Sequence, residues 1–280
     1  MSEIIQGSRL ALAIRKKVED QVQGLSQTPG LAAILVGDDP ASHLYVSLKE
    51  RAAKEAGIYF ERIEYPKGVL QGKLLKDIRK LNKRDDIHGI LVQLPLPNQD
   101  ENAVIGAIDS RKDVDGFHKE SLRHLFRSEP GLVPPVALAI LKLIEATRQP
   151  LQGKTAIIIG NHKIFAEPII HLMKELGIEA SFTKRDESAL AAKTRAADII
   201  VVAIGEAAFI TKDMVKEGGI VIDVGTNKID RKTIGDAAED VVGHAGFISP
   251  VPGGVGPLTV AYLLNNVVKA MILHKKEETK

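Results

Sequence analysis

The sequence predicts an α/β protein with two parallel-sheet domains. Short apolar runs, such as those at 31–37 and 155–160, are typical of parallel strands that are buried on both faces. Between the runs, apolar residues recur at helical spacing, and strands that alternate with helices favour parallel sheets with right-handed crossovers. A chain of 280 residues is also long enough for two domains of about 100–200 residues each.

The first half of the chain predicts three strands separated by helices. Leu10, Ile14 and Val18 lie at helical spacing and indicate a helix over 8–23. A strand follows at 31–37, and the next helix, from 40 to about 56, has an acidic N-cap before Pro40 and ends at Gly57. The remaining elements expected here are a strand at 58–63, a helix at 72–81 and a strand at 87–93.

A second series begins after an irregular stretch near 118–135. The expected elements are a helix at 134–148, a strand at 155–160, a helix at 164–176, a strand at 179–183, a helix at 187–196, and strands at 198–203 and 219–224. A last helix at 258–273 is expected to pack on the first half. The predicted domains are therefore residues 1–125 with 258–280, and residues 126–257, the second a Rossmann-like doubly wound parallel sheet.

The composition excludes several classes of function. Without cysteine, the chain can form neither disulfides nor thiolate metal sites, and its eight histidines lack a metal-ligand spacing. Lys+Arg 38 against Asp+Glu 36 implies no large basic surface for nucleic acid. We see no apolar run of the ~18 residues that a membrane span needs, and no signal-peptide core. We expect a cytoplasmic protein without metal, nucleic-acid or membrane partners.

Three polar residues share one face of the helix that begins at residue 40. Tyr45 and Lys49 are four residues apart, and Ser42 precedes Tyr45 by three. The helix begins at the carboxyl end of a strand, where open α/β sheets bind ligands. A helical lysine is usually a solvated surface group. Alternatively, a lysine held in a cleft has a pKa lowered by desolvation and can transfer protons near neutral pH.

Further polar residues lie near the ends of strands. Gln93 interrupts an apolar strand, and it either satisfies backbone groups or points into a crevice beside Lys49. Asp113 and Asp115 flank a single valine before a glycine. They are either ordinary turn residues, or one caps the loop while the other accepts hydrogen bonds from a polar ligand.

The most specific local signal is the segment at 250–257, where three glycines and three prolines precede the last helix. Glycine lets the backbone approach a ligand closely, and a proline begins the helix. A plain connection rarely needs so much control of the backbone.

Together these segments resemble the bifunctional methylenetetrahydrofolate dehydrogenase/methenyltetrahydrofolate cyclohydrolase family. The matching text is VGDDPASHLYVSLKERAAKEAGI, GILVQLPLP, KDVDGFH, VIDVGTN and SPVPGGVGPLTVAYLLNN, in an order that covers nearly the whole chain. The resemblance implies a folate cleft between a catalytic half and a nucleotide-binding half. It also implies tetrahydrofolate one-carbon derivatives as substrates, NADP or NAD as cofactor, and a homodimer.

The resemblance also assigns roles by motif position. Lys49 is similar to the family's essential lysine, Gln93 to the partner of that lysine, and Tyr45 to the tyrosine that stacks on folate. Asp115 is similar to the aspartate that holds the pterin. The further residues that this analogy places along the cleft are Ser42, Pro252, Gly253 and Gly254.

The nucleotide-binding half departs from the family's pattern. Where the family usually reads G-R-S-x-I-V-G-x-P, this chain reads GNHKIFAEP, so that Ala166 adds a Cβ where a helix N-terminus would meet a pyrophosphate. Basic and acidic residues then mix at 184–187, where an acidic residue favours NAD and an arginine favours NADP. The basic side chains either rebuild a phosphate site or are solvated charges. The cofactor-binding candidates are Gly160, Asn161, His162, Lys163, Ile164, Lys184, Arg185, Gly205, Asp223 and Thr226.

Three functional hypotheses follow. The first is a bifunctional enzyme that oxidises methylenetetrahydrofolate and hydrolyses the methenyl product, with Lys49 transferring protons. The second is a cyclohydrolase whose dehydrogenase activity is weak or lost. The third is a non-catalytic protein that senses folate or nucleotide, against which the intact set of Ser42, Tyr45, Lys49, Gln93 and Asp115 argues.

Overall fold

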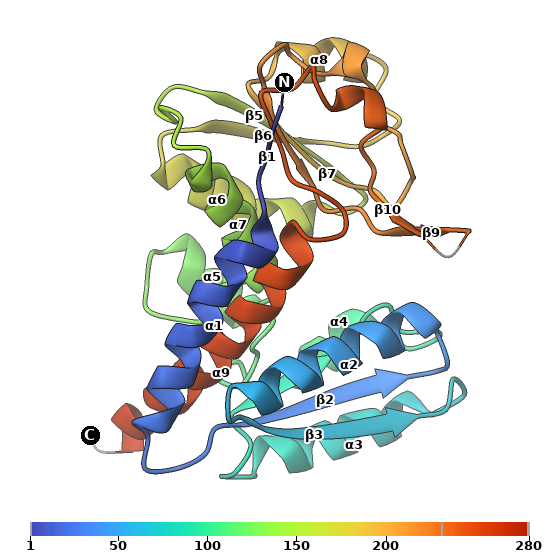
Figure 1. Ribbon diagram of the computed structural model, residues 1–280. Coiled ribbons are helices and arrows are strands. Elements are labelled where there is room, and N and C mark those ends of the chain that lie inside the picture. Colours follow the sequence, from blue (N-terminus) through green and yellow to red (C-terminus); the bar gives the residue numbers. More distant parts are fainter. Residues whose placement is uncertain (1, 231, 279–280) are drawn as a thin grey trace. The chain divides into compact units, whose positions relative to one another are not determined.

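A computed structural model describes residues 2–230 and 232–278, with the backbone alone over 275–278 (Figure 1). The chain divides into two compact units. The first contains Met1–Ala11 and Val136–Thr259, and the second contains Leu12–Pro135 and Val260–Lys280. We name them the six-stranded unit and the three-stranded unit after their sheets.

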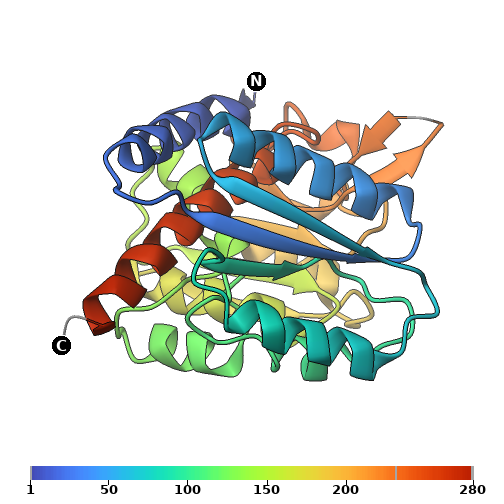
Figure 2. The same ribbon diagram turned by 90° about the horizontal axis from the view of Figure 1, so that it is seen from below.

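The sheet of the three-stranded unit has β2 (Gly30–Val36) at its centre, between β3 (Tyr59–Tyr65) and β4 (Gly89–Val92), and all its strands are parallel. Helix α2 (Pro40–Glu55) covers one face and α3 (Gln71–Asn82) the other (Figures 1 and 2). Every residue of β2 is buried, because Leu31, Ala33 and Leu35 pack in the core with α2 while the alternate residues pack with α3.

The expected start of α2 is confirmed. Asp39 is the N-cap and its carboxylate accepts a hydrogen bond from the Ser42 N–H at 2.8 Å. Pro40 occupies the first turn, and Gly57 follows the helix with a positive φ of 75°. The sequence thus fixes where α2 leaves the carboxyl end of β2.

Within the described residues, the other unit contains a six-stranded parallel sheet in the order β1-β11-β8-β7-β5-β6, in which β1 is Glu3–Ile4, β11 is Phe247–Ile248 and β8 is Ile220–Asp223. From β5 (Thr155–Gly160) the chain passes to β6 (Glu179–Thr183) on one side and then crosses to β7 (Ile199–Ala203) on the other side of β5. This is the switch point of a doubly wound sheet, and ligands bind at the carboxyl ends of its strands. The predicted α/β class is therefore confirmed.

Most predicted elements are present, with boundaries shifted by a few residues, although the helix expected at 187–196 begins only at Leu190. The remaining predicted elements are α1 (Gly7–Gln23), α6 (Pro135–Ala146), α7 (Lys163–Glu175), α8 (Leu190–Ala196), β8 (Ile220–Asp223) and α9 (Val255–Glu278). The elements that the sequence patterns missed are β1 (Glu3–Ile4), α4 (Glu101–Ile105), α5 (Lys119–Phe126), β9 (Asn227–Ile229), β10 (Lys232–Ile234), β11 (Phe247–Ile248) and the short 3-10 helices Lys212–Met214 and Glu239–Val241.

Helix α9 is the one described helix that is long and apolar enough, by length and composition, to cross a membrane. No such stretch was expected from the sequence, so that expectation is wrong at α9. The window Val255–His274 is 56% buried in the protein, and Leu263, Leu264 and Val267 belong to the core beside β2 and α2. Packing in that core accounts for the apolar composition of α9.

Candidate functional site

The carboxyl end of the three-stranded sheet brings Lys49 and Gln93 together. The Lys49 ammonium donates a hydrogen bond to Oε1 of Gln93 at 2.9 Å. Gln93 follows β4, and its backbone N–H continues the sheet by donating to the Ile34 carbonyl at 2.8 Å. Its side-chain Nε2 donates to the Leu94 carbonyl at 2.8 Å, which leaves the amide oxygen facing the lysine. Gln93 therefore both satisfies a backbone group and contacts Lys49.

The surroundings of Lys49 stabilise its charged form less than water does. The side chain is half-buried, and burial lowers the pKa of its ammonium, while the nearby Asp115 carboxylate raises that pKa in part. Burial in turn raises the pKa of Asp115, against the opposing effect of Lys49. The direct partner of the ammonium is the uncharged amide of Gln93, which cannot stabilise the positive charge as a carboxylate would. Lys49 is thus suited to take up and release a proton.

The two aspartates that flank Val114 have different surroundings. Asp113 is buried, and its carboxylate accepts hydrogen bonds from the His118 N–H at 2.8 Å and from the Ser121 hydroxyl at 2.9 Å. Burial raises the pKa of Asp113 to about 6. Asp113 therefore closes the loop that leads into α5, whereas Asp115 is the carboxylate whose charge acts on Lys49.

The other folate-site candidates divide between the two units. Ser42 is buried in the first turn of α2, and Tyr45 is half-buried one turn further along. The segment with Pro252, Gly253 and Gly254 belongs to the six-stranded unit. There the Gly253 carbonyl accepts a hydrogen bond from the N–H of Ser8 at 2.8 Å.

The switch-point loops of the six-stranded unit hold most of the cofactor candidates. Gly160 ends β5, and the side-chain amide of Asn161 donates to the Ile204 carbonyl after β7 at 3.1 Å, which ties these two loops together. His162 is the N-cap residue of α7, but no described side chain makes a cap hydrogen bond there. The Phe165 N–H donates to the His162 carbonyl at 3.2 Å, so an anion can accept from the N–H groups of Lys163 and Ile164 at the start of the helix.

The basic candidates are mostly at the surface. Lys163 pairs with Glu167 one turn along α7 at 3.4 Å, and the neighbouring Ile164 is 44% exposed. Lys184 is exposed as well. Arg185 pairs with Glu206 at 2.7 Å, and this pair links the loops after β6 and β7.

Ala166 does not obstruct the N-terminus of α7. Its side chain is fully buried, so its methyl group packs inside the unit. The expected conflict between this methyl group and a pyrophosphate is therefore absent from the described geometry of α7.

Asp223 is buried, while Gly205 and Thr226 are exposed. The buried Asp223 carboxylate accepts hydrogen bonds from the backbone N–H groups of residues 225, 236 and 237 at 2.8–3.0 Å, and burial raises its pKa to about 6. Asp223 thus holds the backbone after β8.

Sequence reasoning missed Asp236. Its fully buried carboxylate accepts hydrogen bonds from the N–H groups of residues 204, 205 and 206 at 2.8–3.0 Å, and from the Asn227 amide at 2.9 Å. It therefore fixes the loop that carries Gly205 and Glu206. Asp236 follows a glycine, so the sequence offers only an ordinary turn signal at this position.

Comparisons with known proteins identify the family. Two family models match the chain: the catalytic domain of tetrahydrofolate dehydrogenase/cyclohydrolase over residues 5–115, and its NAD(P)-binding domain over 134–275. The bifunctional protein FolD of Streptococcus equi subsp. zooepidemicus is 44% identical over 279 residues, which cover 97% of this chain and 98% of that protein.

Solved structures give the same result. The chain is similar to the FolD methylenetetrahydrofolate dehydrogenase/cyclohydrolase of Campylobacter jejuni, with a TM-score of 0.93, 38% identity, and coverage of 98% of this chain and 100% of that one. It is also similar to the Trypanosoma brucei enzyme crystallised with NADP and an inhibitor, with a TM-score of 0.92, 31% identity and 98% coverage of both chains.

Proposed function

Because the chain belongs to the tetrahydrofolate dehydrogenase/cyclohydrolase family, we propose that it oxidises 5,10-methylenetetrahydrofolate with NADP and hydrolyses the methenyl product to 10-formyltetrahydrofolate. The observation that carries the proposal is the half-buried Lys49 ammonium, bound to the neutral amide of Gln93 and influenced by Asp115. We assign residues 1–125 with 258–280 to the catalytic and folate-binding domain, and residues 126–257 to the NAD(P)-binding domain.

For the hydrolysis, Lys49 transfers the protons. In its neutral form it accepts a proton as water adds to the methenyl carbon. The tetrahedral adduct then collapses to the formyl group as one carbon–nitrogen bond breaks. The departing nitrogen takes back the proton that Lys49 accepted, and the hydroxyl proton of the adduct is released to water as the C=O bond forms. A neutral amine does this beside a cationic substrate without adding a fixed positive charge. The lowered pKa of Lys49 supports this role.

Asp115, Tyr45 and Ser42 bind the substrate in this proposal. A carboxylate near the lysine can accept hydrogen bonds from the amino and ring N–H groups of a pterin. Tyr45 offers a ring for stacking from the same helix face as Lys49. Ser42 is buried in the first turn of α2. The family resemblance assigns Pro252, Gly253 and Gly254 to substrate binding as well.

The residues around the switch point fit NADP. The uncapped first turn of α7 suits a pyrophosphate, and Lys184 and Arg185 suit the 2′-phosphate after β6. When bound, NADP accepts the hydride. The chain's own task in the oxidation is to hold the nicotinamide and the folate carbon in line.

The decisive variant is Lys49→Met. We expect loss of methenyltetrahydrofolate hydrolysis, measured as the decay of methenyl absorbance, by at least about a hundredfold, within the range for a proton-transfer residue. Arg51→Met is the matched control, since Arg51 lies on the same helix and pairs with Glu55 at the surface. Circular dichroism should be unchanged in both variants. Hydrolysis by Lys49→Met well above the uncatalysed rate would refute the assignment.

We infer further that the protein is a cytoplasmic homodimer that needs neither nucleic acid nor membrane. The family resemblance supports the dimer, and the near balance of basic and acidic residues argues against a nucleic-acid partner. Sedimentation at several concentrations tests the dimer, because a monomer at all of them would contradict it.

A further inference from the structure

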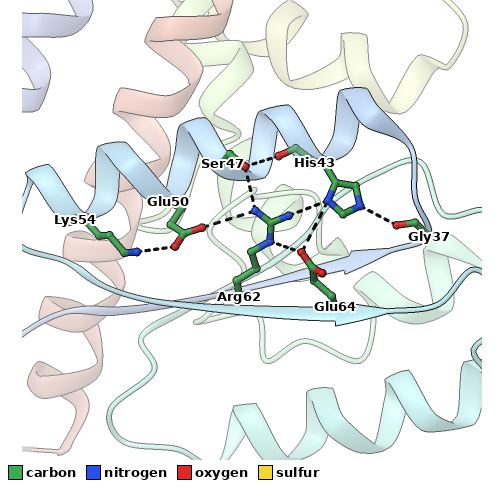
Figure 3. A network of polar contacts seen from close by, with 7 residues as sticks. All are labelled: Gly37, His43, Ser47, Glu50, Lys54, Arg62 and Glu64. Carbon is green, nitrogen blue, oxygen red and sulfur yellow. Dashed lines mark hydrogen bonds and ion pairs between the residues drawn. The ribbon is translucent and has the colours of Figure 1, made fainter.

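The flank of α2 that meets β3 carries a chain of polar contacts (Figure 3). Arg62 on β3 lies at its centre, with a side chain that is 23% exposed. Its guanidinium donates to the Ser47 hydroxyl at 3.0 Å and lies 3.7 Å from the Glu50 carboxylate. It also donates to Glu64 on its own strand. One arginine therefore contacts successive turns of α2.

The contact between Arg62 and His43 fixes the state of the imidazole. Nε2 of His43 lies 3.1 Å from the Gly37 carbonyl, which can only accept, so Nε2 carries the proton. Nδ1 is then the acceptor for the Arg62 guanidinium at 2.8 Å. The Glu64 carboxylate also faces this nitrogen, at 3.8 Å. A neutral ring thus bridges the backbone after β2, the first turns of α2, and β3.

This polar flank lies away from the face that carries Lys49. At 3.6 residues per turn, the stripe at 43, 47, 50 and 54 and the stripe at 42, 45 and 49 lie roughly 130° apart around the helix axis. A further face, with Val46 and Ala53, is buried in the core. Apolar packing is not directional, so it limits rotation of the helix less strictly than a set of hydrogen bonds does.

We propose that Arg62 and His43 are positioning residues for Lys49, and this inference rests on the function proposed above. They fix the rotation of α2 about its axis. A rotation of about 10° would move an ammonium about 8 Å from the axis by more than 1 Å. Such a shift breaks the 2.9 Å contact with Gln93, and misplacements of about 1 Å are known to cost catalysis up to a hundredfold.

The first test compares Arg62→Met with Arg84→Met. Arg84 is a matched arginine that pairs with Glu61 of the same strand and with Asp86. We expect Arg62→Met to lower kcat for methenyltetrahydrofolate hydrolysis about tenfold, with KM within about twofold, because proton transfer is misaligned while substrate contacts remain. Arg84→Met should keep the wild-type kcat. Equal kcat in the two variants would overturn the inference.

The second test uses rescue by an isosteric amide. In His43→Gln, Nε2 can donate to Gly37 and Oε1 can accept from Arg62, so kcat should stay within about twofold of wild type. His43→Ala should lose about as much as Arg62→Met. Equal losses of kcat in His43→Gln and His43→Ala would contradict a positioning role for the His43 contacts with Gly37 and Arg62. These two variants test the inference even if Arg62→Met fails to fold. If the wild type itself did not hydrolyse methenyltetrahydrofolate, the proposed function would fail instead.

Discussion

At the carboxyl end of the three-stranded sheet, a half-buried amine meets a neutral amide and a nearby carboxylate, and none of these groups neutralises the others by direct ion pairing in the contacts described above. At the carboxyl end of the six-stranded sheet, the buried carboxylates of Asp223 and Asp236 accept backbone hydrogen bonds. The ion pair between Arg185 and Glu206 lies at the surface. The two regions therefore use buried ionisable groups in different ways. A group that moves protons is buried with few partners, whereas a group that shapes a binding loop is buried with many.

The largest contrast is expected between Asp236→Ala and Asp115→Asn. The first removes an acceptor from four donors, one buried and three part-buried, at roughly 1 kcal/mol each, and should lower the free energy of unfolding by about 3 kcal/mol. The second should leave unfolding nearly unchanged and reduce turnover about a hundredfold. Urea unfolding and methenyltetrahydrofolate assays measure both. A stability loss in Asp115→Asn as large as that in Asp236→Ala would erase the distinction.

A smaller effect should appear in the choice of cofactor. Arg185→Ala should raise the KM for NADP about tenfold, or about 1.4 kcal/mol, and leave the KM for NAD unchanged, because only NADP carries the 2′-phosphate. Glu206→Gln is the informative partner variant, since it removes the carboxylate that now holds Arg185 and should lower the KM for NADP. If Arg185→Ala changed the KM for NADP and the KM for NAD equally, Arg185 would have no role in binding the 2′-phosphate. Failure of the wild type to bind either cofactor would favour the second hypothesis, a cyclohydrolase whose dehydrogenase activity is weak or lost.

Prediction succeeded best where one stretch of sequence determines the outcome. The apolar runs of β2 and β5 and the start of α2 needed no distant partner. In contrast, β1 and β11 have two residues each and exist because they pair with one another, so no periodic pattern marks them. Helix α5 has only eight residues, too few for a clear apolar stripe.

The site residues also divide into those marked by local sequence and those defined by tertiary contacts. Lys49 and Gln93 were predictable because an interrupted apolar run and a helix position marked them, and the family resemblance paired them. Arg62 lies in a strand that reads YFERIEY, which resembles any half-solvated strand, and its partners come from another element. Asp236 is likewise defined by N–H groups some thirty residues earlier in the chain. Such roles depend on tertiary contacts.

The smallest effect concerns pH and stability, where the two units should behave alike. Burial raises the pKa of Asp113 in one unit and of Asp223 in the other to about 6. Their stabilising contribution is therefore complete below about pH 4 and is lost as the pH rises through 6. Unfolding free energy should rise by about 1 kcal/mol between pH 8 and 6, before the ion-paired carboxylates titrate. Asp223→Asn should remove part of that rise, and an unaltered pH profile in this variant would contradict it.

The path of the chain between the units has a consequence for biosynthesis. The chain passes from one unit to the other within α1, beside the start of α6, and within α9. Side chains of α9 complete the core beneath α2, so the three-stranded unit cannot finish folding until the final helix has left the ribosome. The nucleotide-binding segment is therefore synthesised in full before the proton-transfer lysine acquires its finished surroundings. A single break in the gene cannot separate the two activities into independent proteins.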